Sequence, residues 1–394
     1  MKVQTGLDVL IKDKTLQQKY KGNVALLCHN ASIDSEYTPA AVAFKEIFDS
    51  RFIKLFGPQH GFSTDVQDNM IETDHFIHSY FNIPVYSLYS ETRIPSDEML
   101  EGIDHLFVDL QDVGCRMYTY IYTLTYLLEK CAGKDIEIII LDRPNPINGV
   151  DMEGNILDMD YESFIGRHPI PVRHAMTIGE VALMHQEFWV KKKANVSVIK
   201  MNNWEREMFF EDTQLPWLLP SPNLPRATSA FTFPATVLFE GTMLSEGRGT
   251  TQSLEIVGHP KIEPYSFYKN HLSNSLKESK LKGVALRPIT FLPTFQKQAD
   301  KVCGGFQIHI TDKNTFQPWR VGQFLMRELY HYLGDDFEWK QPPYEYDYTR
   351  KPIDIINGSD KLRNWVVNNE SLDVLNSFEN LENYKQQFNS IKIY

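Results

Sequence analysis

The sequence predicts an α/β protein in which a Rossmann-like parallel-sheet domain is followed by a smaller α+β domain. Two observations lead to this prediction. Short apolar runs of strand length alternate with helical segments over the first half of the chain, which is the pattern of βαβ units and a parallel sheet. The length of 394 residues also exceeds the usual size of one hydrophobic core, so two domains are expected. We place them at residues 1–225 and 226–394.

Six apolar runs of the first domain are expected to be strands buried on both faces of the sheet. They are Val24–Cys28, Phe52–Phe56, Val85–Leu88, His105–Leu110, Ile136–Leu141 and Asn195–Met201. The segments expected to form helices between them are Thr38–Asp49, Ser96–Glu101, Tyr120–Lys130 and Thr177–Lys193. The last of these begins with Thr177 three residues before Glu180, which is the spacing of a capping box.

The composition of the sequence changes toward the second domain. From about Trp204 the sequence is aromatic and rich in proline, and long loops of this kind are uncommon unless they line a binding surface. Beyond the boundary near Pro225 we expect strands and helices to mix. The expected strands are Gly283–Leu292 and Gly305–Thr311, and the expected helices are Val321–Leu333 and Leu372–Gln386.

The first five apolar runs all end in a loop that carries Asn, Gln, His, Glu, Asp or Arg, whereas their starts carry no such cluster. Because the carboxyl ends of parallel strands meet at one edge of a sheet, five such loops predict a ligand site at that edge. The stretch Ile103–Tyr120 is the clearest case, since a buried strand is followed at once by polar side chains. The alternative interpretation is a network of caps and ion pairs at an ordinary turn.

Composition excludes several classes of function. The formal net charge of −11 argues against nucleic acid and anionic membranes as partners. No apolar run approaches the roughly 18 residues of a membrane span. No apolar signal segment follows the N-terminus, so we expect a cytoplasmic protein, or an exported one if a signal has been trimmed. The four cysteines are widely spaced and no His stands at metal-ligand spacing, which predicts reduced thiols and no metal site.

An organic cofactor is not expected either. The turn after the first predicted strand is His29–Ser32, which lacks the GxGxxG motif of dinucleotide-binding domains, and the chain has no Walker A motif. No GxSxG elbow is present, which weakens an α/β-hydrolase interpretation.

Carboxylates are abundant at the predicted sheet edge. Glycoside hydrolysis usually needs two, one protonated to assist the leaving group and one to activate water or attack. The candidates are Asp68, Glu72, Glu91, Asp109, Asp112, Asp142 and Glu246, although any one of them is more often a cap or an ion pair. Glu91 is the best placed, because it follows a buried strand beside Tyr89 and Arg93, where partial desolvation would raise its pKa. Gln59 and His60 follow the neighbouring strand.

Five arginines also fall in loops near these strand ends: Arg93, Arg116, Arg143, Arg173 and Arg248. A guanidinium group is the natural partner of a planar carboxylate, so they could bind an acidic substrate. Pairing with the neighbouring Asp residues explains them equally well. Tyr118 could stack on a sugar ring, and the glycine-flanked loop Ser245–Thr251 suits close approach of the backbone to a ligand.

A series of motifs covers nearly the whole chain in order. They are GLDVL (Gly6–Leu10), FGPQHG (Phe56–Gly61), PVYSLY (Pro84–Tyr89), DLQDVGCRMYTY (Asp109–Tyr120), LDRPNPING (Leu141–Gly149), PVRHAMTIGE (Pro171–Glu180), PSPNLP (Pro220–Pro225), SEGRGTT (Ser245–Thr251) and CGGFQIHITD (Cys303–Asp312). Together they resemble the NamZ-type exo-β-N-acetylmuramidases, formerly a domain-of-unknown-function family. The resemblance implies a Rossmann-like catalytic domain and an auxiliary domain that closes a cleft. It also implies release of terminal N-acetylmuramic acid from the non-reducing end of peptidoglycan fragments, or of a related amino sugar.

One motif departs from the family pattern. Many relatives read PEHG where this chain has Gln59, and that glutamate is their expected catalytic acid. A glutamine cannot exchange a proton, so we expect the acid role to have moved to Glu91 or, second, to Glu72. Asp112 or His60 would then position water, and Arg116, Arg143 and Arg248 would bind the lactyl carboxylate. The other expected substrate contacts are Asn30, Gln59, Arg93, Tyr118, Asn145, Asn223 and Glu246.

Two alternatives stay open at this point. The chain could be a non-catalytic sugar or muropeptide sensor that kept the pocket and lost the acid at Gln59. An ester or amide hydrolase that uses the same loops is weaker, because no activated nucleophile is visible.

Overall fold

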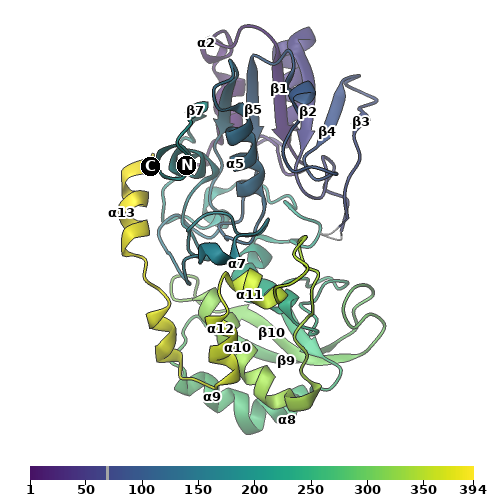
Figure 1. The fold of residues 1–394 in the computed structure, drawn as a ribbon, viewed down its shortest axis with the longest axis vertical. Helices are drawn as coiled ribbons and strands as arrows, with labels where there is room; N and C mark the ends of the chain where they lie inside the picture. Colours follow the sequence, from purple (N-terminus) through teal and green to yellow (C-terminus); the bar gives the residue numbers. More distant parts are fainter. Residues whose placement is uncertain (68–70) are drawn as a thin grey trace.

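The computed structural model describes residues 1–67 and 71–394 (Figure 1). A seven-stranded sheet in the order β3-β4-β2-β1-β5-β6-β7 forms the core of the first half. All neighbouring strands are parallel except β3 and β4. The strands are β1 Val24–Cys28, β2 Phe52–Gly57, β3 Phe76–Ile77, β4 Pro84–Ser87, β5 His105–Asp109, β6 Glu137–Leu141 and β7 Asn195–Ile199. The predicted α/β class and the six predicted strands are therefore confirmed, and β3 is an added edge strand.

Helices cover both faces of this sheet, which is why its strands are apolar throughout. On one face, Leu26 packs with Phe44 and Leu10. On the other face, Leu27 belongs to the same cluster as Leu124 and Val181. The helices and short helical turns of this half are α1 Gly6–Lys12, α2 Lys14–Gln17, α3 Ala40–Phe48, η1 Asp49–Arg51, α4 Asp97–Leu100, α5 Tyr120–Cys131, η2 Met159–Tyr161, α6 Ile178–Met184, η3 His185–Trp189 and η4 Phe210–Thr213.

The predicted helix after Thr177 forms with the expected start. The Thr177 side chain accepts a hydrogen bond from the Glu180 backbone, and the Glu180 side chain accepts one from the Thr177 backbone, so the capping box is present. The helical segment ends at Trp189 rather than at the predicted Lys193.

The second half is built on a three-stranded antiparallel sheet in the order β8-β10-β9. Figure 1 shows this sheet in the lower part of the molecule, with α7 and α11 between it and the larger sheet. The strands are β8 Ile256–His259, β9 Val284–Phe291 and β10 Cys303–Ile310, which include both predicted strands. The helical segments are α7 Ala227–Thr236, η5 Val237–Gly241, α8 Pro264–Phe267, η6 Tyr268–Leu272, α9 Ser273–Glu278, α10 Pro318–Leu333, η7 Gly334–Asp336, α11 Pro352–Asn357, α12 Lys361–Val367, η8 Leu372–Ser377 and α13 Glu382–Ile391.

The predicted helix Leu372–Gln386 is wrong. The segment breaks after η8, and α13 then runs back along the first half of the molecule (Figure 1). There the Tyr384 hydroxyl donates to the His174 carbonyl at 2.5 Å, and the Tyr394 hydroxyl donates to Asp142 at 2.8 Å. The end of the chain is therefore held by the first half, although the sequence places it in the second.

Candidate active site

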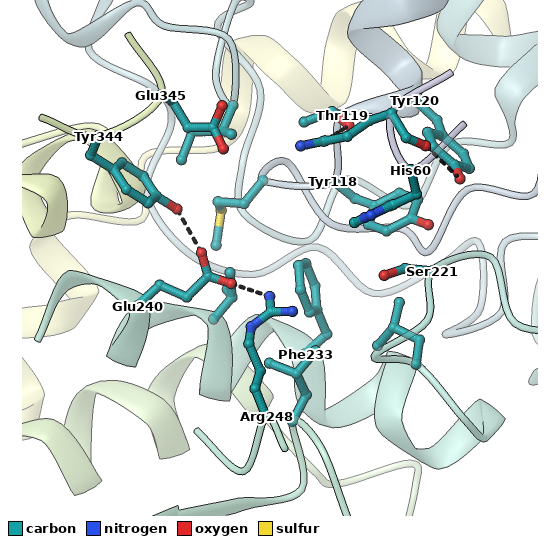
Figure 2. Close-up of a pocket in the computed structure, with 16 residues that line it drawn as sticks. His60, Tyr118, Thr119, Tyr120, Ser221, Phe233, Glu240, Arg248, Tyr344 and Glu345 are labelled. Carbon is teal, nitrogen blue, oxygen red and sulfur yellow. Dashed lines mark hydrogen bonds and ion pairs between the residues drawn. The ribbon is translucent and has the colours of Figure 1, made fainter. Parts of the chain in front are cut away.

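A pocket lies at the seam between the large sheet and the second half of the molecule (Figure 2). The first half supplies its walls from the loops after β2 and β5 and from the proline-rich segment. The second half supplies α7, η5 and two loops. The lining residues are Gln59, His60, Met117, Tyr118, Thr119, Tyr120, Ile165, Ser221, Leu224, Phe233, Val237, Glu240, Arg248, Leu254, Tyr344 and Glu345. Four of the predicted site residues, Gln59, His60, Tyr118 and Arg248, are thus brought together.

The wall from the first half is polar and closely packed. The Thr119 hydroxyl donates to Gln59 Oε1 at 2.5 Å, and both side chains are buried. His60 has a φ of 70°, a left-handed conformation that is uncommon outside glycine and that clusters at functional sites. Its Nδ1 lies 2.8 Å from the Val66 carbonyl oxygen. The turn that leads to Gln59 and His60 requires a glycine at position 57, because a Cβ there would lie only 2.6 Å from the backbone nitrogen of Phe62.

The opposite wall is a buried network of charges. Arg248 forms ion pairs with Glu240 and, at 3.0 Å, with Glu246. The Tyr344 hydroxyl donates to the second oxygen of Glu240 at 2.7 Å (Figure 2). Lys297 lies 2.7 Å from Glu246. Burial alone would raise the pKa of Glu240, but Arg248 and the Tyr344 hydroxyl outweigh it and hold that pKa below its usual range, so Glu240 is ionised.

Glu345 is the other carboxyl of the pocket. It is only 4% exposed, and burial, with the charge of Glu240 as the next cause, raises its pKa to about 8. Glu345 is therefore protonated at neutral pH while Glu240 is charged. Figure 2 shows both on one side of the pocket, facing His60 and Thr119 on the other. Two carboxyls whose surroundings drive their pKa values apart are the arrangement that acid/base catalysis needs.

Glu72 and Arg93 lie beside the pocket rather than in its lining. Arg93 donates hydrogen bonds to the Ser90 carbonyl and to the Tyr346 hydroxyl, and its guanidinium lies 3.9 Å from the Tyr89 ring centroid and 4.6 Å from that of Tyr346. The Tyr346 hydroxyl also donates to Glu72 at 3.0 Å. These contacts join the loop after β4 to residues 344–348, which carry Glu345.

The expectation for Glu91 is wrong on burial. Its side chain is exposed rather than partly buried. Glu91 lies in the loop after β4. In that loop the Tyr89 side chain is buried, whereas the Glu91 side chain is at the surface. Asp68, another predicted rim carboxylate, lies outside the described residues.

Two of the three arginines expected to bind the substrate carboxylate are used by the fold. Arg116 is fully buried and donates to the backbone carbonyls of Asn155, Ile170, Ile356 and Asn357 at 2.7 to 3.4 Å. Arg143 forms a bidentate pair with Asp109 and donates to the Ile33 carbonyl at 2.7 Å. These contacts occupy Nη1 and Nη2 of Arg116 and Nε and Nη2 of Arg143, so the pairing alternative holds for Arg143 and a backbone role holds for Arg116.

The remaining predicted residues also make structural contacts. Asp112 accepts from the Gly114 backbone at 2.7 Å, and its Oδ2 lies 3.3 Å from His174 Nε2. Asn145 holds its own turn through the Ile147 backbone, at 3.1 Å. Asn223 donates to the Gln67 carbonyl at 2.9 Å. Asn30 is exposed, and its backbone donates to Thr64. Among the residues that the structure describes, none of these four lines the pocket.

Comparison with known proteins places this site in a family. The model of the N-terminal region of exo-β-N-acetylmuramidase NamZ matches residues 24–228, and the model of its C-terminal region matches residues 231–394. The chain belongs to the NamZ exo-β-N-acetylmuramidase family. The resemblance inferred from the motifs is confirmed. The two family models meet between residues 228 and 231, and the domain boundary near Pro225 stays a prediction.

Relatives cover nearly the whole chain. The peptidoglycan β-N-acetylmuramidase NamZ of Bacillus subtilis (strain 168) is 39% identical over 380 residues, which are 96% of this chain and 88% of that protein. Two crystal structures of DUF1343 family proteins from Bacteroides fragilis are similar over 100% of this chain and 99% of theirs, with TM-scores of 0.87 and 0.75 and identities of 29% and 27%.

In this NamZ-family chain, the sequence prediction missed the acidic wall of the pocket. Glu240 lies in η5, and Tyr344 and Glu345 lie in a loop before α11, so no strand of the large sheet leads to them. The run PPYEYDY could have indicated this wall, because it follows two prolines and combines aromatic with acidic residues. In addition, the described residues 1–67 and 71–394 contain no cluster of three His, Cys, Asp or Glu side chains that could hold a metal ion, and none of their helices is long and apolar enough to cross a membrane.

Proposed function

We propose that this chain is an exo-β-N-acetylmuramidase that releases terminal N-acetylmuramic acid from peptidoglycan fragments, and that the bond is cleaved in the pocket around Glu345 and Glu240. Family membership over residues 24–228 and 231–394 supports the activity. So does the relative that is named a peptidoglycan β-N-acetylmuramidase. The observation that carries the proposal is the pair of buried carboxyls, one protonated and one ionised, in one pocket of the seam.

The two carboxyls divide the chemistry between them. Glu345 is the general acid and protonates the glycosidic oxygen as the bond to the sugar breaks. Glu240 keeps its negative charge and stabilises the positive charge that develops on the sugar ring. A water molecule then adds to the anomeric carbon in place of the leaving group, and the proton that it gives up restores the Glu345 acid. The charge of Glu240 also raises the pKa of Glu345, so removing Glu240 lowers the fraction of Glu345 that is protonated at neutral pH as well as the stabilisation of the sugar cation.

Gln59 supports this assignment of the acid. It lines the pocket at the position where the family pattern described above is expected to have glutamate, and its amide cannot exchange a proton. Its contact with Thr119 fixes the side chain, which suits Gln59 to orient the substrate by hydrogen bonds. The acid role then falls to Glu345, on the opposite wall, rather than to the exposed Glu91 or the rim residue Glu72.

The pocket is narrow in this structure. It leaves about 40 Å³ of space for water, whereas one water needs about 10 to 15 Å³ by the same kind of measure. A sugar ring therefore enters only if the walls separate. The loop of residues 344–348 forms one of these walls, and its contacts with the first half include those of Tyr346 with Arg93 and Glu72. Closure of this loop would bring Glu345 onto the bound sugar and exclude bulk water.

Turnover of p-nitrophenyl β-N-acetylmuramide, with the β-N-acetylglucosaminide as control, tests the activity. We expect release of p-nitrophenol from the muramide and little from the glucosaminide. Glu240→Gln should lower kcat by about 10²-fold or more, because it removes a charge from a water-poor site. The matched control is Glu129→Gln, which changes a half-exposed glutamate that pairs with Arg167 away from the pocket.

A sugar-binding protein without turnover is the second candidate, and Gln59 in the pocket is the observation that favours it. Saturable binding of N-acetylmuramic acid by the wild type, with no hydrolysis of either the p-nitrophenyl muramide or a muramic-acid-terminated disaccharide, would establish this alternative and refute the enzyme.

A further inference from the structure

Helix α7 separates the pocket from a second cleft on its other side. Phe233 lines the pocket, whereas Phe231, two residues earlier, lies 5.1 Å from the Arg173 guanidinium and packs against Phe316. Residues two apart on a helix point in nearly opposite directions, so Phe231 lies on the side of the helix away from the pocket, beside two residues that line the second cleft. The second cleft has about 400 Å³ of space for water, about ten times that of the pocket, and Arg173 and Phe316 both line it.

Two buried side chains of this cleft have unused hydrogen-bonding capacity. Arg173 is 2% exposed, and its Nε has no hydrogen-bond partner among the described residues. Glu153 is 4% exposed; one oxygen accepts from the Arg320 backbone at 2.9 Å, and within the same described set the other oxygen has none. Leaving such groups unpaired costs about 1 to 3 kcal/mol each, and most buried polar groups in proteins are paired. A hydrogen-bond acceptor on a ligand would satisfy the Arg173 donor, and Glu153 could donate to the same ligand in its protonated form, which burial favours by raising its pKa to about 7.

The charge of the cleft indicates the sign of that ligand. Three cations line it, Arg173 at its buried end and Lys280 and Lys282 at its exposed rim. Arg173 is 3.3 Å from Asp151, which lines the cleft and is half-exposed. Neither lysine has a carboxylate within 4.0 Å in the described part of the chain. Two carboxyls, Asp151 and Glu153, also line the cleft, and the three cations outnumber them. This local excess of positive charge, in a protein whose net charge is −11, attracts anions.

We propose that this cleft is a second ligand site, which binds the carboxylate of an acidic peptidoglycan fragment through Arg173, Lys280 and Lys282. Guanidinium pairs with a planar carboxylate, and the two lysines draw the anion to the rim. The carboxylate has two sources in such fragments, the lactyl group of N-acetylmuramic acid and the end of a short acidic peptide. The choice of fragment rests on the function proposed above, whereas the presence of an anion site does not.

Isothermal titration calorimetry of the full chain tests the site, with N-acetylmuramic acid, the dipeptide alanyl-glutamate and N-acetylglucosamine as probes. The test variant is Lys280→Ala with Lys282→Ala. The charge-matched control is Lys261→Ala with Lys269→Ala, two exposed lysines elsewhere in the second half. All four lysines are exposed, so these variants keep the fold, whereas a change at the buried Arg173 would not guarantee it.

We expect one binding equivalent of a carboxylate probe that weakens by about tenfold or more in the test variant and is unchanged in the control. N-acetylglucosamine, which lacks the carboxylate, should not show this lysine-sensitive binding equivalent. If the lysine-sensitive equivalent appears with N-acetylmuramic acid, the lactyl group is the source; if it appears only with alanyl-glutamate, the peptide is. Equal binding by the test and control variants for both probes would overturn the second site. That failure is distinct from a failure of the enzyme, which would show as absent hydrolysis of the muramide by the wild type.

Discussion

Two loops of this protein carry a glutamate next to tyrosines, and the structure treats them differently. Glu91, in the loop after β4, follows a buried strand, yet its side chain is exposed. Glu345, in the loop before α11, follows no strand, yet it is 4% exposed and lines the pocket. The loops meet through Arg93, which contacts the rings of both Tyr89 and Tyr346. Burial between two facing halves, rather than position after a strand, therefore raises the pKa of a carboxyl into the range where it can act as an acid at neutral pH.

The largest expected effect comes from Glu345→Gln. Removing the general acid should lower kcat on a muramic-acid-terminated disaccharide by about 10²- to 10⁴-fold. The folded structure should persist, since the wild-type side chain is already neutral at pH 7 and the amide has nearly the same shape. Steady-state kinetics and circular dichroism of both proteins check this. A loss of less than threefold would assign the acid role to another group.

The pH dependence of kcat gives the next effect. Glu345 acts in its protonated form, and burial raises its pKa to about 8. Activity that depends on it should therefore stay level below that pH and fall about tenfold per pH unit above it. Rates measured from about pH 3.5 to 10 in the wild type test this limb. An activity that instead falls between about pH 4 and 5 would indicate an acid with an ordinary pKa, such as an exposed glutamate.

The same group links stability to pH. Its folded pKa of about 8 exceeds that of an unfolded glutamate, which is about 4.3. Folding therefore favours the protonated form, and the free energy of unfolding should decline as pH rises from about 4.3 to about 8. Glu345→Gln should make this decline shallower in urea denaturation curves. Part of the slope will persist, because burial also raises the pKa of Asp142 and of Glu153 to about 7. An unchanged slope in the variant would contradict the buried, protonated state of Glu345.

A smaller effect is expected at Arg93, which holds the two loops together. Arg93→Met removes the hydrogen bonds to Ser90 and Tyr346 and should lower kcat/KM by about tenfold, because Glu345 is then less well positioned. Arg51→Met is the matched control, since Arg51 also donates to a backbone carbonyl and lies over an aromatic ring, but far from the loop. Hydrogen exchange of residues 344–348 should speed up in the first variant and not in the second. Equal kinetics in both variants would show that the Arg93 contacts do not position the acid.

The smallest effect is expected at Glu91. Because its side chain is exposed, Glu91→Gln should leave kcat unchanged and alter the free energy of unfolding by less than about 0.5 kcal/mol. The same assays check it. A large loss of activity would restore the first assignment of the acid and would invert the comparison between the two loops.

The fold was predictable where local patterns decide it. The apolar strands and the Thr177 capping box follow from periodicity and spacing, and the structure confirms them. The break between η8 and α13 could not be predicted in this way, because α13 and the end of the chain are held by distant residues such as His174 and Asp142.

The candidate site was predictable only in part. Its first wall follows from the loops after β2 and β5, which bring Gln59, His60 and Tyr118 together. Arg116 and Arg143 lie in similar loops, but Arg116 donates to backbone carbonyls and Arg143 pairs with Asp109. A single sequence does not show which partner each arginine binds. Glu345 comes from the second half of the chain, and its pKa is raised only because the two halves pack together and bury it.

The most direct test of the central claim compares two leaving groups in the wild type and in Glu345→Gln. A sugar leaving group needs a proton as the bond breaks, whereas p-nitrophenolate leaves readily without one. If Glu345 is the general acid, its loss should cost about 10²-fold more on the muramic-acid-terminated disaccharide than on p-nitrophenyl β-N-acetylmuramide. An equal loss on both substrates would contradict the account and would mean that Glu345 shapes the pocket without giving its proton to the leaving group.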